Sequence, residues 1–160
     1  MTDPLTVFVP GTPAPQGSAR AIVHKHTQRA VLIKDNNARQ KTWREDVRAR
    51  LTDDCWEPLA RFEGAVAIEL AFVLKRPVST PKTRATPPAI KKPDLDKLVR
   101  AVFDAITSAG IWVDDSAVVR LAATKRIAEL GETTGCYITI RDSGAVQPQL
   151  LAFDLKEVTA

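Results

Sequence analysis

Acidic residues at two places in the second half of the chain have the types and spacing of a metal site. Asp94 and Asp96 stand two residues apart at the start of a long apolar segment, and the pair Asp114 and Asp115 follows that segment. Hard cations such as Mg²⁺ take oxygen ligands from a few carboxylates, water and phosphate. A cation bound in this way can activate water to hydrolyse a phosphodiester. The pattern therefore indicates metal-assisted phosphodiester chemistry.

The first two aspartates can share one ion only if Asp94 lies outside the helix, because residues two apart on a helix point to different sides. Pro93 favours this, since it biases Lys92 towards an extended backbone and lets Asp94 be the N-cap. Helix capping is an alternative explanation for both aspartates, each stabilising a helix start by about 0.5–2 kcal/mol. The acidic pair further on could likewise be a solvated turn before a strand.

A basic, proline-rich segment, residues 75–93, comes immediately before Asp94. It contains six basic residues, five prolines and no acid. Prolines remove backbone donors, so we expect a loop and not a helix or a central strand. A loop of this length within a compact domain is usually functional or disordered. Next to an acidic cluster it could bind a DNA backbone, and the alternative is a disordered linker whose charges keep it soluble.

Two helices are expected to position these residues. The clearer one follows the first aspartates and is ended by Gly110. Its apolar face has helical spacing and consists of Leu95, Leu98, Val99, Val102, Phe103 and Ile106. The other is capped by Asp35 or Asn36 and runs to about Leu51, with a basic face that could simply be solvated. Its expected buried stripe is Trp43, Val47 and Leu51.

Six strands are expected from runs of β-branched and apolar residues. They are residues 5–10, 21–26, 29–33, 65–74, 118–126 and 136–141. The second and third form a hairpin, and the fourth is a central strand. Together with the helices they predict one α+β domain over residues 1–142, a mixed β-sheet packed against two main helices. A tail over residues 143–160 follows, with a possible short strand or helix at residues 150–158.

The composition fits a soluble protein of one domain, with 44% hydrophobic and 26% charged residues in a chain of 160. The 23 Lys and Arg exceed the 19 Asp and Glu by 4, which favours a polyanionic partner without identifying it. The first residues lack the features of a signal peptide, and no apolar run approaches the ~20 residues that span a bilayer. We expect a cytoplasmic protein with no membrane partner, in which Cys55 and Cys136 are reduced.

Several stretches together resemble one family. Residues 92–106 read KPDLDKLVRAVFDAI, residues 110–119 read GIWVDDSAVV, Lys125 follows, and residues 9–20 read VPGTPAPQGSAR. In this order, from Leu5 to about Arg141, they are similar to the RusA-type Holliday-junction resolvases. The resemblance implies a homodimeric endodeoxyribonuclease, bacterial or phage-encoded, that resolves four-way DNA junctions in recombination and repair. It also implies Mg²⁺ as the cofactor, with Mn²⁺ as a possible substitute.

Carried over by position, the family's catalytic, metal-binding aspartates fall on Asp94, Asp96 and Asp115, with Asp114 as a possible auxiliary ligand. The family's functional helix lysine falls on Arg100, which keeps the charge but does not readily release a proton, so only an electrostatic role transfers. The asparagine expected after the second aspartate is a lysine here, which adds charge near the scissile phosphate. The expected DNA-binding residues are Arg20, Lys82, Arg84, Lys91, Lys92, Lys97 and Lys125.

Some residues keep two interpretations. His24 and His26 share one face of a predicted strand, where a position near DNA or sheet packing is favoured over zinc binding because no further ligand has suitable spacing. Trp112 could stack on a base of an opened junction or close the core under the acidic turn. Lys125 could contact phosphate or be solvated. At the level of function, the alternatives are a non-catalytic DNA-binding module and a nuclease of the same fold that acts on flaps or forks.

Overall fold

The computed structural model describes residues 4–17, 20–23, 30–33, 38–52 and 62–144. In chain order the elements are β1 (Leu5–Pro10), β2 (Arg20–Val23), β3 (Ala30–Ile33), α1 (Ala38–Thr52), β4 (Val66–Leu74), α2 (Leu95–Ala109), the short 3-10 helix η1 (Asp115–Ala117), β5 (Val118–Ile127) and β6 (Gly135–Asp142). The predicted α+β class, with a mixed sheet and two main helices in one domain, is confirmed.

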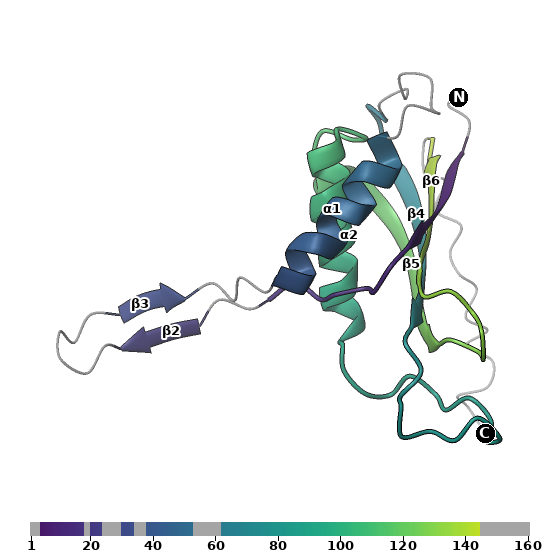
Figure 1. Ribbon diagram of the computed structural model, residues 1–160. Helices are drawn as coiled ribbons and strands as arrows, with labels where there is room; N and C mark the ends of the chain where they lie inside the picture. Colours follow the sequence, from purple (N-terminus) through teal and green to yellow (C-terminus); the bar gives the residue numbers. More distant parts are fainter. Residues whose placement is uncertain (1–3, 18–19, 24–29, 34–37, 53–61, 145–160) are drawn as a thin grey trace, which may run out of the picture.

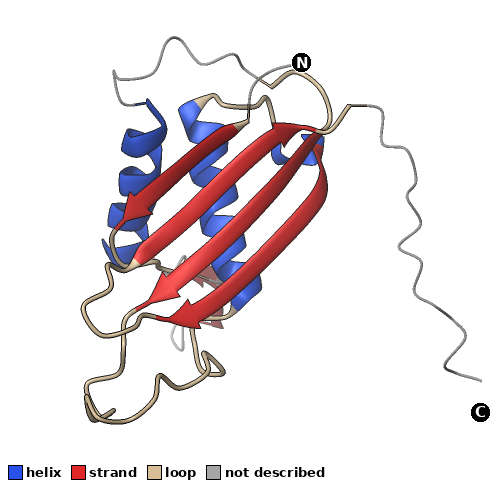
Figure 2. Cartoon of the chain, turned by 90° about the vertical axis from the view of Figure 1, so that its right-hand side faces the viewer, coloured by secondary structure: helices blue, strands red, loops and turns tan. Residues whose placement is uncertain are grey.

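Four strands form the main sheet in the order β1-β6-β4-β5. β4 and β5 are parallel, whereas β6 is antiparallel to both of its neighbours, β1 and β4. The predicted central position of β4 is therefore confirmed, and β5 is an edge strand. Both helices lie on the same face of the sheet (Figure 1), and Figure 2 shows the other face, which no described helix covers.

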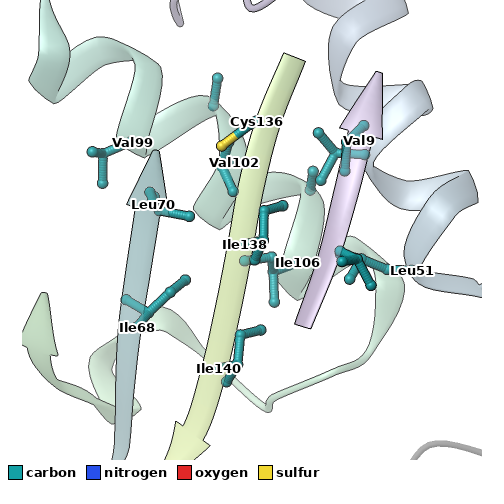
Figure 3. Close-up of a cluster of buried hydrophobic side chains, with 14 of the residues drawn as sticks. Val9, Leu51, Ile68, Leu70, Val99, Val102, Ile106, Cys136, Ile138 and Ile140 are labelled. Atoms are coloured by element: carbon teal, nitrogen blue, oxygen red, sulfur yellow. The ribbon is translucent and has the colours of Figure 1, made fainter. Parts of the chain in front are cut away.

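The core lies between this sheet and the two helices (Figure 3). Side chains of the inner strands alternate between the two faces, so Ile68 and Leu70 of β4 and Ile138 of β6 all point towards the helices. Val102 and Ile106 of α2 pack against them. The predicted stripe of α1 is also confirmed, because Trp43, Val47 and Leu51 are buried.

The connection from β4 through α2 to β5 determines where the candidate site residues lie. Helix α2 begins after Asp94, whose backbone is extended, and ends at Gly110, which adopts the left-handed conformation expected of a helix stop, with φ 75°. The loop of residues 75–94 therefore lies at the ends of the parallel strands β4 and β5, where Figure 1 draws it in teal at the bottom. The acidic turn after α2 leads into the beginning of β5, at the opposite end of the sheet.

Strands β2 and β3 form the predicted hairpin, antiparallel, with Arg20 opposite Ile33. The hairpin extends away from the main sheet (Figure 1). Its turn with His24 and His26, the proposed caps Asp35 and Asn36, Cys55 and the tail from residue 145 lie outside the described residues. Cys136 is free and buried, and desolvation raises the pKa of its thiol to about 12. No described helix is both long and apolar enough to span a membrane.

Candidate functional site

Asp94 occupies the N-cap position of α2, as predicted, but its side chain does not serve as a cap. Its backbone is extended, with φ −71° and ψ 139°, and within the described structure the carboxylate makes no capping hydrogen bond. Instead Oδ2 of Asp94 lies 3.3 Å from Nζ of Lys97, and about half of each side chain is exposed. Asp96 follows in the first turn and is exposed. Capping therefore does not account for Asp94, and both carboxylates are accessible.

Two basic residues follow these two carboxylates on the same helix. Lys97 pairs with Asp94, and Arg100 is exposed one helical turn after Asp96. Residues three and four apart on a helix are surface neighbours, so Asp96, Lys97 and Arg100 share one side of α2. A phosphate at this helix start would meet two cations close to the two acids. This is the juxtaposition expected at a site that binds an anionic diester through its charge.

Lys125, near the end of β5, is hydrogen-bonded to the segment that precedes Asp94. Its ammonium donates hydrogen bonds to the carbonyl oxygens of Lys91, at 3.0 Å, and Pro93, at 2.8 Å. From the sequence, only a phosphate contact or a solvated lysine was expected at this position. The structure adds a third role, because two of the three ammonium donors are used to hold the loop. A DNA contact by Lys125 stays a prediction.

The N-terminal segment before β2 also contacts the start of α2, which was not predicted from the sequence. The backbone N–H of Gln16 donates to the carbonyl oxygen of Lys97 at 3.0 Å. The next backbone N–H, of Gly17, donates to the side chain of Gln40 on α1 at 3.2 Å. Backbone hydrogen bonds of this kind leave no pattern of residue types, so the sequence held no signal for them. They bring the segment of residues 11–17, α1 and α2 together at one place.

The basic loop is held in a defined conformation by Arg76. Its guanidinium donates to the hydroxyl of Thr86 at 2.8 Å and to the carbonyl oxygens of Pro81 and Arg84 at 3.1 and 2.7 Å. Thr86 in turn donates to Glu129 of the turn after β5. The description as a disordered linker does not fit such a loop. Arg76 is engaged inside the loop, whereas the side chains of Lys82, Arg84, Lys91 and Lys92 are exposed.

At the other end of α2, the two residues of the acidic pair differ. Oδ1 of Asp114 accepts the backbone N–H of Ser116 at 2.9 Å and caps η1, and this hydrogen bonding lowers the pKa of Asp114. Asp115 is exposed. Trp112 is buried, donates from Nε1 to Thr107 at 2.6 Å, and closes the core under the turn. Of its two interpretations, the structural one is observed.

One chain does not bring the three predicted metal ligands together. Helix α2 has 15 residues and is about 22 Å long, with Asp94 before it and Asp115 beyond it. The path along β5 agrees, because Val118 follows η1 closely and lies about 23 Å from Lys125, which holds Pro93. Within the described residues, no three His, Cys, Asp or Glu side chains could hold a metal ion jointly. The length of the predicted helix was the available signal for this separation.

Comparison with known proteins adds one finding to this geometry. The family model described as Endodeoxyribonuclease RusA matches residues 10–141 of the chain. The match covers the main sheet from the end of β1, both helices, the basic loop and the acidic positions at both ends of α2. The curated proteins include no significant match.

Proposed function

Because this chain belongs to the RusA endodeoxyribonuclease family, we propose that it resolves four-way DNA junctions by metal-dependent hydrolysis of phosphodiester bonds. The observation that carries the proposal is the start of α2. There Asp94 is half-exposed and Asp96 is exposed, Lys97 and Arg100 follow on the same helix, and an ordered basic loop ends directly before them. Carboxylates, cations and a basic surface are what hydrolysis of a DNA backbone requires.

The proposed cofactor is Mg²⁺, with Mn²⁺ as a substitute. The distance between the aspartates at the two ends of α2 determines which of them can bind the ion together. Asp94 and Asp96 of one chain provide two ligands, and the third has to come from elsewhere. We propose a homodimer in which the partner's Asp115 completes the site, so that each protomer contributes to both centres. When bound, the ion would supply an activated water for attack on phosphorus.

The exposed edge of β5 offers a way to build this dimer. It is a ten-residue edge strand, and the nearby apolar side chains of Val113, Val119 and Leu121 are 63%, 51% and 47% exposed. Unpaired strand edges readily pair with another chain. An antiparallel pairing of two β5 strands about a twofold axis lays the beginning of one beside the end of the other. The partner's Asp115 would then approach Lys125, which holds the segment next to Asp94.

The remaining roles belong to the cations of α2. Arg100 would stabilise the charge that develops on the phosphate, since a guanidinium keeps its proton and cannot act as the base. Lys97, paired with Asp94 in the free protein, is placed to bind the same phosphate once a cation takes its place at the carboxylate. Lys82, Arg84, Lys91 and Lys92 on the loop, and Arg20 on the hairpin, would hold the DNA arms.

The deciding experiment compares cleavage of a synthetic four-way junction by the wild-type protein and by Asp96→Asn, with and without Mg²⁺. We expect paired nicks only from the wild type with metal, while the variant still binds the junction, because removing one acid relieves its repulsion from phosphate. Binding without nicking by the wild type would instead favour a non-catalytic DNA-binding module. Faster cutting of flaps or forks at the same salt concentration would favour the related nuclease activity.

A further inference from the structure

A cavity of about 660 Å³ lies beside the start of α2, and of the residues that line it only Lys91 and Lys92 have a role in the function proposed above. It is bounded by the ends of β4 and β5, by the basic loop and by the N-terminal segment that carries Pro13 and Pro15. Pro93, which immediately precedes Asp94, forms part of its wall. A volume of this size is typical of sites that bind a small organic molecule or one nucleotide.

The walls of the cavity are largely apolar and contain several prolines. Proline rings from both segments line it, together with Leu74 at the end of β4 and Ile127 at the end of β5. Proline fixes its own backbone and has no N–H to satisfy, so these walls need little ordering when a ligand enters. Lys125 adds rigidity, because its hydrogen bonds to Lys91 and Pro93 fix one wall to β5. The cavity is therefore largely preformed.

The charges around the cavity select the kind of ligand. Lys75, Lys91, Lys92 and Arg39 line it, and none of its lining residues is acidic. The hydroxyl groups of Thr12, Ser79 and Thr80 are the uncharged polar side chains among the lining residues, and each can donate or accept a hydrogen bond. The ligand that fits has an apolar body with polar groups at its edges and carries negative charge. A nucleotide has this chemistry, whereas a cation or a purely apolar molecule does not.

We propose that the cavity takes one unstacked nucleotide of the DNA substrate, next to the phosphate that is cut. This inference rests on the nuclease function proposed above. A base inside a duplex is stacked and paired, and it enters a pocket only where leaving the stack costs little. A branch point is such a place. Because the wall residue Pro93 adjoins Asp94, a nucleotide held here places its neighbouring phosphate at the start of α2, and the cavity couples recognition of branching to cleavage.

The test uses the full-length protein and a four-way junction that carries a single 2-aminopurine, a base whose fluorescence rises when it leaves the stack. The cut position is mapped first with unlabelled DNA, and the probe is then placed on either side of it in turn. Binding is followed in EDTA, so that the strand stays intact. We expect fluorescence to rise roughly several-fold at one of these positions on binding, and a linear duplex of the same sequence to give no rise.

Two double variants locate the effect. Ser79→Leu with Thr80→Leu adds bulk at two lining residues, whereas Thr83→Leu with Ala85→Leu adds the same side chains to exposed positions of the same loop that do not line the cavity. We expect the first pair to abolish the fluorescence rise and to slow junction cleavage by about ten-fold, at the lower end of what a changed pocket contact costs. The second pair should leave both unchanged.

The outcomes separate the cavity from the nuclease function. If the junction binds and is cut while neither probe position responds, or if the response survives the two cavity leucines, the nucleotide site is overturned and the nuclease proposal stands. An equal rise with the linear duplex also overturns it, because recognition would then not depend on branching. If the wild-type chain neither binds nor cuts the junction, the proposed function fails and the cavity proposal fails with it.

Discussion

The ammonium of Lys125 lies 2.8 Å from the carbonyl oxygen of Pro93, so the end of strand β5 is hydrogen-bonded to the residue immediately before Asp94. The hydrogen bond thereby joins β5 to the segment before α2, at the proposed active site. Both elements belong to the connection that runs from β4 through α2 to β5. A second bond, to the carbonyl oxygen of Lys91, extends the attachment into the basic loop. The position of Asp94 thus depends on a side chain 31 residues further along the chain.

Replacing Lys125 distinguishes a role in positioning Asp94 from a role in binding phosphate. Lys125→Met removes both hydrogen bonds but keeps an unbranched apolar stem of similar shape. We expect the cleavage rate at saturating protein to fall by about ten-fold, since misplacing a catalytic group is costly, while junction affinity and its salt dependence stay unchanged. Titrations of binding against salt, beside single-turnover cleavage, check this. Weaker binding, with a salt slope reduced by about 0.9, would identify Lys125 as a phosphate ligand instead.

Mixed dimers test whether the metal site is shared between two chains. Asp96→Asn and Asp115→Asn are each expected to abolish cleavage alone. In a mixed dimer with a shared site, one centre carries both substitutions and the other carries neither. Mixing equal amounts after unfolding and refolding should therefore restore nicking to about a quarter of the wild-type level, since about half of the dimers are mixed and each has one intact centre.

The matched control for this experiment mixes Asp94→Asn with Asp96→Asn, two substitutions at the same end of α2. Here every centre carries one substitution, so no activity should return. If the Asp96→Asn and Asp115→Asn mixture also stays inactive although both variants form dimers, each centre uses the acids of one chain, and the shared site is rejected.

Arg100 is one of two positions, with Lys97, at which this sequence departs from the family pattern that it resembles. If its role is electrostatic, Arg100→Lys should retain most of the cleavage rate and Arg100→Ala should lose about 10²-fold or more, as for removal of one stabilising donor. Rates measured from pH 6 to pH 10 provide the check. Proton transfer would predict that a basic limb of the pH profile disappears in Arg100→Ala, whereas an electrostatic role predicts a profile of unchanged shape at a lower rate.

The exposed cations of the basic loop should determine the salt dependence of binding. Replacing Lys82, Arg84, Lys91 and Lys92 by glutamine should weaken junction binding and lower the slope of log K against log salt by about 0.9 for each phosphate that the loop no longer neutralises. Thermal stability should change little, because these side chains are exposed. Lys41→Gln with Arg48→Gln on α1 is the comparison. If only this second pair weakens junction binding and lowers its salt dependence, the DNA-binding surface lies on α1.

Patterns of apolar residues and turn chemistry were sufficient to predict the two main helices and the strands of this fold, but not the short 3-10 helix η1. The apolar face of α2, its end at Gly110 and the central position of β4 follow from spacing and turn chemistry, and the structure confirms each of them. Such patterns succeed because burial of one face dominates the free energy of a helix or strand. The N-cap position of Asp94 was predicted from Pro93 and is also confirmed, although the side chain pairs with Lys97 and does not cap the helix backbone.

Side-chain contacts between distant segments could not be predicted in the same way. The bonds from Lys125 to the loop and from Arg76 to the carbonyl oxygens of Pro81 and Arg84 join side chains to backbone, and a backbone acceptor is present at every residue. The sequence therefore marks the donors but not their partners. Convergence of the aspartates was inferred from their residue types and from the family resemblance, and the length of the intervening helix is what opposes it within one chain.

The crossover through α2 has a consequence for the geometry of cutting. In the proposed dimer, each centre combines acids from opposite ends of this crossover, so the backbone lengths of α2 and β5 determine how far apart the two cuts are made. Removing one helical turn would change that distance by about 5 Å without altering any ligand. The fold would thus determine the distance between the two cut sites. DNA would be a substrate only if its two strands lie at that distance from each other.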